Sequence, residues 1–162
     1  MFARRLIVCF LPLFWIAVAT ASLGVISLEE LTNRAELIVY GRVVSIEAST
    51  VLPDGISEGG GVPVSMATIR ILPYKILKGN TEDGLLVRSV ENMEDSPRFR
   101  KGQEVFLFLT RNTDDSTYLT IGLTQGKFDV INGMVVREAR VSVDSFMESI
   151  LRLVHAQGEG VD

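Results

Sequence analysis

Apolar residues occupy both alternating sets of positions in the segment 35–46, Ala-Glu-Leu-Ile-Val-Tyr-Gly-Arg-Val-Val-Ser-Ile. A strand with one solvated face alternates apolar and polar residues, so this segment predicts a strand that is covered on both faces. Gly41 lies in its middle, where a glycine weakens a strand unless the backbone bends, bulges or is closely approached. The segment therefore predicts a strand that curls across a small barrel. The alternative is a central strand of a flat sheet with an incidental glycine.

Later segments also have strand patterns. Pro73 interrupts the first of them and indicates a bulge or an edge, because proline cannot donate to a strand ladder. Asn132-Gly133 predicts a tight type I′ hairpin, since both residues tolerate positive φ. Two long loops, 48–63 and 92–102, separate the strands. The expected strands are 65–78, 85–91, 105–109, 118–123, 128–131 and 134–137.

A short helix is expected at each end of this strand region. Ser27-Leu28-Glu29-Glu30 matches a capping box and predicts one or two helical turns that end near Arg34, with a polar loop as the alternative. Ser142 or Asp144 is expected to cap a C-terminal helix. That helix carries an apolar stripe at helical spacing, formed by Phe146, Met147, Ile150, Leu151 and Val154. The pattern predicts five to seven mostly antiparallel strands between two helices.

The first 21 residues have the features of a signal peptide. Arg4 and Arg5 precede an apolar run from Leu6 to Ala19, and Ala19-Thr20-Ala21 is a small-x-small cleavage pattern. The run is shorter than the roughly 20 residues of a spanning helix, so cleavage is favoured over a retained anchor. We expect residues 1–21 to be removed and residues 22–162 to form a single exported domain, periplasmic or extracellular.

Composition narrows the classes of function. The single cysteine, Cys9, lies in the expected leader, so the remaining chain has no disulfide or thiolate chemistry. Loss of Arg4 and Arg5 leaves 14 basic against 20 acidic residues, a net charge of −6 in place of −4. An acidic surface repels phosphate backbones and anionic lipids, so neither a nucleic-acid partner nor a membrane contact beyond the leader is expected.

Several segments together resemble the tissue-inhibitor-of-metalloproteinase and netrin-module superfamily, including its uncharacterised exported bacterial branch. They are 35–43, 71–79 ending in Leu77-Lys78-Gly79, 101–109, and Gly126-Lys127-Phe128. The resemblance spans roughly residues 28–137 and implies a mainly β fold, an OB-like five-stranded antiparallel barrel with up to seven strands. Family inhibitors place an N-terminal cysteine on the protease zinc. The expected mature terminus here is Ser22-Leu23-Gly24, so that mechanism has no residue to use.

Few residues in this sequence are candidates for a catalytic role. The single histidine, His155, is expected to be exposed and stabilised by the dipole at the end of the last helix. The acidic pairs in turns lack calcium-loop spacing, and no serine lies in a Gly-x-Ser-x-Gly motif. No catalytic, cofactor-binding or metal-binding residue is predicted, and no cofactor is expected.

The remaining candidate is a contact surface. Arg98, Arg100 and Lys101 surround Phe99 and could contact an acidic partner, the alternative being a solvated loop. The sequence favours an exported, non-enzymatic binding module whose partner is a protein or a small extracytoplasmic ligand, and it leaves the oligomeric state open. The alternatives are a small hydrolase that uses carboxylates such as Asp54, Glu58 or Glu91, and an atypical protease inhibitor.

Overall fold

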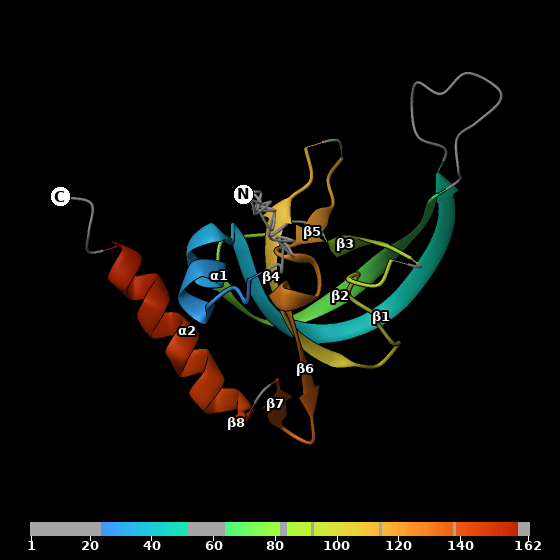
Figure 1. The fold of residues 1–162 in the computed structure, drawn as a ribbon. Coiled ribbons are helices and arrows are strands. Elements are labelled where there is room, and N and C mark those ends of the chain that lie inside the picture. Colours follow the sequence, from blue (N-terminus) through green and yellow to red (C-terminus); the bar gives the residue numbers. More distant parts are fainter. Residues whose placement is uncertain are drawn as a thin grey trace, which may run out of the picture.

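A computed structural model describes residues 24–51, 64–81, 84–91, 93–113, 115–137 and 139–158 (Figure 1). The expected leader, most of the 48–63 loop and the last four residues lie outside these ranges. The elements, in chain order, are α1 (Leu28–Arg34), β1 (Leu37–Val51), β2 (Val64–Lys78), β3 (Leu85–Val90), β4 (Glu104–Arg111), β5 (Tyr118–Thr120), the 3₁₀ turn η1 (Leu123–Gly126), β6 (Lys127–Ile131), β7 (Met134–Val136), β8 (Arg140–Ser142) and α2 (Val143–Gly158).

Five strands close into a barrel in the order β1-β2-β3-β5-β4, and β4 pairs back with β1. Every pairing is antiparallel except that of β3 with β5, which is the OB-like arrangement. The predicted fold class is therefore confirmed. One edge of β4 pairs with β1. The other edge pairs with β6 along its first half and with β5 along its second half, and β7 and β8 extend the sheet from β6 outside the barrel.

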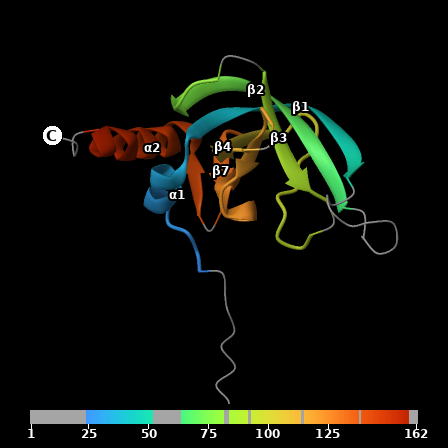
Figure 2. The ribbon, with the colours of Figure 1, turned by 90° about the horizontal axis from the view of Figure 1, so that it is seen from above.

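Two hydrophobic cores explain why β1 and β4 are apolar on both faces. Alternate residues such as Leu37, Val39 and Leu107 point into the barrel, where they pack with Ile69, Val87 and Tyr118. The intervening residues, such as Ile38, Phe106 and Phe108, lie outside the barrel wall. They pack against Leu31 of α1 and against Phe146 and Ile150 of α2. Figures 1 and 2 show α1 and α2 together on one side of the barrel, while the β1–β2 ribbon extends away on the other side.

Gly41 lies where the backbones of three strands meet. It pairs with Pro73 of β2 and with Val105 of β4, and the β1–β2 register shifts next to it. A Cβ atom at Gly41 would lie 2.5 Å from the backbone oxygen of Leu72. Close approach therefore requires the glycine, and the register shift confirms the bulge that was predicted at Pro73.

The helix ends are capped as the sequence predicted. Ser27 Oγ accepts a hydrogen bond from the Glu30 backbone N–H at 3.1 Å, and Ser142 Oγ accepts one from Ser145 at 3.2 Å. Glu30 does not complete the capping box, since its carboxylate pairs with Arg34 at 3.4 Å. The predicted stripe of α2 packs on the outer core.

The Lys78 side chain joins α1, α2 and β2. Its Nζ donates to the backbone oxygen of Thr32 at 2.7 Å and to Gln157 Oε1 at 3.1 Å. Gln157 Nε2 in turn donates to Asn33 Oδ1 at 2.6 Å. A lysine thus binds the carbonyl end of the short helix, where cations are favoured.

Polar contacts also fix β1 at its start. The Glu36 carboxylate accepts from Thr110 Oγ1 at 2.6 Å and from the Arg111 backbone N–H at 3.2 Å, and these donors lower the pKa of Glu36. Tyr40 donates its hydroxyl to Glu104 at 2.8 Å. Burial, followed by this contact, raises the pKa of Tyr40 to about 12.

Some predicted boundaries were wrong. Residues 48–51 belong to β1, because β1 and β2 remain paired as far as Val51 and Val64. The strand predicted over 118–123 ends at Thr120, since Gly122 adopts φ of +59° and the chain turns into η1. The hairpin prediction was confirmed, with φ of +51° at Asn132 and +73° at Gly133. β8 was not predicted.

Candidate functional site

The segment that follows β3 closes one end of the barrel. Ser89 Oγ donates to the backbone oxygen of Pro97 at 3.2 Å, which joins the segment to β3. Near its other end, Gly102 N donates to the Val43 oxygen at 2.8 Å and Val43 N donates to Gln103 at 2.9 Å. Hydrogen bonds to two strands therefore hold residues 93–103 in place.

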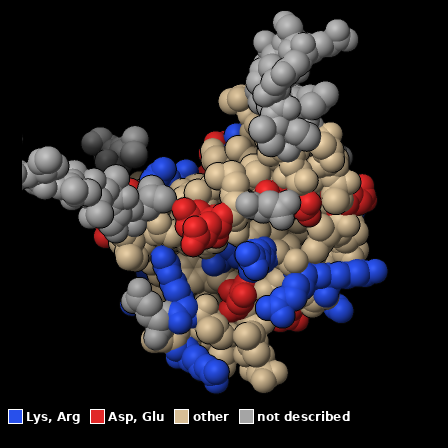
Figure 3. Space-filling view, turned by 45° about the vertical axis from the view of Figure 1, so that its right-hand side comes forward, with Lys and Arg blue, Asp and Glu red and all other residues tan. Residues whose placement is uncertain are grey.

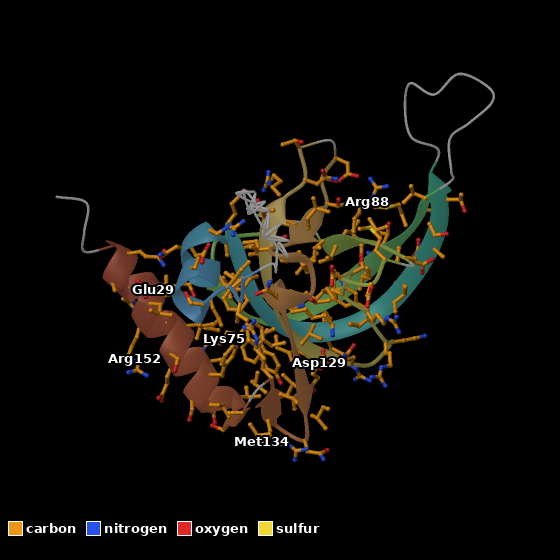
Figure 4. The ribbon with its side chains drawn as sticks, in the orientation of Figure 1. Glu29, Lys75, Arg88, Asp129, Met134 and Arg152 are labelled. Atoms are coloured by element: carbon orange, nitrogen blue, oxygen red, sulfur yellow. The ribbon has the colours of Figure 1, made fainter. Side chains whose placement is uncertain are left out.

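Phe99 is the side chain of this segment that packs inward. It lies partly buried against the barrel core, and Lys127 Nζ of β6 lies 5.3 Å from its ring centroid. Lys127 also forms an ion pair with Asp129, which Figure 4 labels on β6. The aromatic ring thus closes the barrel interior while its other side meets a cation.

A hollow of about 450 Å³, here called the mouth pocket, remains beside Phe99. It lies at the end of the barrel where β1 and β3 approach their last residues and β2 begins. Its volume falls within the range of small-molecule sites. The apolar part of its lining comes from Ile46, Ala67, Ile69, Val90, Met93 and Phe99.

The polar lining of the mouth pocket contains Ser96, Arg98 and Glu91. Arg98 has no ion-pair partner among the described residues. Ser96 is buried, with 5 % of its surface exposed, and its Oγ makes no side-chain hydrogen bond within the described part of the chain. Ser96 and Arg98 also line a second hollow of about 340 Å³, so they form the wall that the two hollows share. The mouth pocket thus combines apolar lining residues with the exposed cation of Arg98 and the buried Ser96.

The four residues predicted as a contact patch lie in different surroundings. Arg98 lines the mouth pocket, and Phe99 packs inward beside it. Lys101 lines a separate shallow groove with Arg42 and Leu72. Arg100 is exposed and lines none of these hollows, and its backbone N–H donates to Gln103 Oε1. On the face of the molecule drawn in Figure 3, Lys and Arg side chains are spread over the lower half, with acidic side chains between them.

A third hollow, of about 480 Å³, lies toward the opposite end of the barrel. Its cation is already engaged, because Arg111 Nη2 donates to the Tyr118 hydroxyl at 3.3 Å. Nearby, Asp115 accepts from the Thr117 backbone N–H and pairs with Arg88 at 2.8 Å (Arg88 is labelled in Figure 4). Hydrogen bonds from Thr117, with Arg88 adding to them, lower the pKa of Asp115. These polar groups stabilise the β4–β5 turn, so this hollow is the weaker candidate.

The other sequence candidates are placed as follows. His155 is exposed in the last turn of α2. Asp54 and Glu58 lie outside the described residues, and Glu91 lines the mouth pocket. Within the described ranges, no group of three or more His, Cys, Asp and Glu side chains is placed to hold a metal ion. In the same ranges, no helix has the length and hydrophobicity needed to cross a membrane.

The sequence suggested Arg98 and Phe99 as contact residues but gave no signal for Ser96 or for the apolar residues that line the mouth pocket. A serine before Pro97 carries no motif, and the wall combines residues from three strands. No protein-family model and no curated protein sequence matches this chain.

Proposed function

We propose that this protein is an exported, non-enzymatic binding module that holds a small extracytoplasmic ligand in the mouth pocket. The observation that carries the proposal is a hollow of about 450 Å³ with both apolar and polar lining residues, where Arg98 makes no ion pair with another described residue. Small-ligand sites typically combine a mostly apolar lining with a few polar groups that orient the ligand. OB-like barrels commonly bind ligands through a strand face and its adjoining loops.

The mouth pocket is held in shape before any ligand arrives. The segment 93–103 is bonded to β1 and β3, and Phe99 is packed against the barrel core. A preformed site loses little conformational entropy on binding. Among the described residues that line the pocket, Glu91 is the one carboxylate. Two-carboxylate hydrolysis needs a second acid, and the other two carboxylates of that hypothesis, Asp54 and Glu58, lie outside the described residues.

A fragment screen by two-dimensional ¹H–¹⁵N NMR tests the proposal on the purified protein. We expect some fragments to shift amide signals of β3 and residues 93–99 in a saturable way, while signals of α2 stay unchanged. Substitution Ile46→Trp, which enlarges an exposed side chain of the pocket wall, should abolish those shifts without unfolding the barrel. A chemically diverse library that shifts no signal of the mouth pocket would contradict the proposal.

A further inference from the structure

We infer that the mouth pocket takes a carboxylate carried on an apolar body. This inference rests on the proposed binding function and names the chemical class of its ligand. Arg98 supplies a guanidinium that forms no ion pair with any described residue, Ser96 supplies a largely buried hydroxyl, and both residues line the pocket. A guanidinium binds a carboxylate through parallel N–H donors, and a serine hydroxyl adds a further donor.

The rest of the lining fits the body of such a ligand. Ile46, Val90, Met93 and Phe99 are the apolar lining residues with exposed surface, and Phe99 gives the hollow an aromatic wall, while Ala67 and Ile69 are buried behind them. Apolar area buried there adds affinity in proportion to chain length. An anion without an apolar body would gain only the contacts at Ser96 and Arg98, which solvent screens strongly.

Glu91 fixes the orientation of the ligand. Its carboxylate lines the pocket and has no ion pair with Arg98. A bound carboxylate is repelled by Glu91, so its head lies at Ser96 and Arg98 and its body lies along the apolar wall. Glu94 lines the second hollow on the other side of Arg98 and adds the same repulsion there.

Isothermal titration with four probes tests this ligand class. Octanoate should bind with amide shifts at Ser96 and Arg98, and butyrate should bind at least about tenfold more weakly, since it buries fewer methylene groups. Octan-1-ol and octylamine carry the same body without the anion and should bind at least about tenfold more weakly than octanoate. If octan-1-ol or octylamine bound at these residues as tightly as octanoate or more tightly, a carboxylate would not be the preferred ligand class. The proposed binding function would be unaffected by that result.

Matched variants distinguish a specific effect of Arg98 from the effect of the protein's net charge on binding of the anion. Arg98→Gln should weaken octanoate about tenfold, and Ser96→Ala should weaken it about threefold to fivefold. Arg100→Gln removes the same charge from the same segment outside the pocket and should change the affinity less than twofold. Glu91→Gln should tighten binding about twofold to threefold. Equal losses in the Arg98 and Arg100 variants would assign the effect to net charge and overturn the inference.

The carboxylate could belong to a free acid or to the C-terminus of a peptide. A tripeptide ending in leucine, compared with its C-terminal amide, distinguishes these sources from octanoate. Binding of either acid that is lost in Arg98→Gln supports the inference, and the tighter acid identifies the source. Failure of both acids would overturn the ligand class, whereas the binding function itself fails only if the fragment screen also finds no ligand.

Discussion

Adding one methyl group at Gly41 should destabilise the barrel more than its size suggests. Gly41 is buried, and β1 pairs through it with both β2 and β4. The Cβ atom of Gly41→Ala would lie 2.5 Å from Leu72 O, 3.0 Å from Ile71 Cγ2 and 3.1 Å from Pro73 Cα. Two of these three neighbours are backbone atoms, which cannot rotate away.

The cost follows from this geometry. The Leu72 oxygen must move by about 0.5 Å or more, because a Cβ atom and a backbone oxygen need roughly 3 Å or more between them. Overpacking of a buried site costs about 1–3 kcal/mol, so we expect about 2 kcal/mol for Gly41→Ala. Gly41→Val places two more methyl groups near Ile71 and should cost about 4 kcal/mol. Against a total stability of about 5–15 kcal/mol, either loss is large.

Urea unfolding followed by far-ultraviolet circular dichroism measures these losses as shifts of the midpoint at constant m-value. Gly84→Ala is the matched control, because the nearest atom to its Cβ would be Arg70 Nη1 at 3.6 Å. That control should stay within about 0.5 kcal/mol of the unmodified protein. If Gly41→Ala were as stable as Gly84→Ala, the close strand approach at the barrel seam would be refuted.

The remaining predictions concern the outer core, two titrating groups and the helix ends. Phe106→Ala should cost about 3–5 kcal/mol, because Phe106 is fully buried and stacks on Tyr40 at 4.7 Å; the half-exposed Ile131→Ala should cost under about 1 kcal/mol in the same unfolding assay. The pKa of Glu36 is lowered in the folded protein, so the stabilisation by its ionised carboxylate is present above the ordinary pKa of 4.5 and is lost as the pH falls. Glu36→Gln should therefore reduce the loss of unfolding free energy at acid pH, and an unchanged loss would contradict this. The pKa of Tyr40 is raised to about 12, so the stabilisation by its protonated hydroxyl is present below pH 10 and is lost between about pH 10 and 12. Tyr40→Phe should reduce the loss of unfolding free energy in that pH range, and an identical loss in both proteins would refute the role of Tyr40. Lys78→Met should cost about 1–2 kcal/mol and speed amide hydrogen exchange in the last turn of α1, whereas unchanged exchange there would show that the contact is dispensable.

Much of the barrel could be predicted from local chemistry. The apolar residues on both faces of 35–46 indicated a strand buried on both sides, and Asn132-Gly133 gave the hairpin through its tolerance of positive φ. The pattern could not show that Leu37 and Ile38 belong to different cores, because that depends on how the helices pack outside the barrel. The end of β5 was missed because Gly122 in the left-handed region overrides the apolar run around it.

The sequence alone predicted less of the candidate site than of the fold. Arg98, Phe99, Arg100 and Lys101 read as one basic group, yet tertiary packing turns Phe99 inward and separates Arg98 from Lys101. Ser96 became a candidate only once its hydroxyl was found unpaired beside Arg98. The lining also combines Ile46 and Ile69, which pair directly across β1 and β2, with Val90 of β3 and Phe99, and this combination depends on tertiary packing.

A crystal structure of the protein grown with octanoate tests the central claim most directly. We expect a carboxylate within about 3.2 Å of both the Arg98 guanidinium and Ser96 Oγ, with its alkyl chain against Phe99 and Met93. The barrel backbone should match that of the free protein, because the segment 93–103 is already bonded to β1 and β3. An empty mouth pocket at saturating octanoate, or octanoate bound only at another surface, would contradict the account.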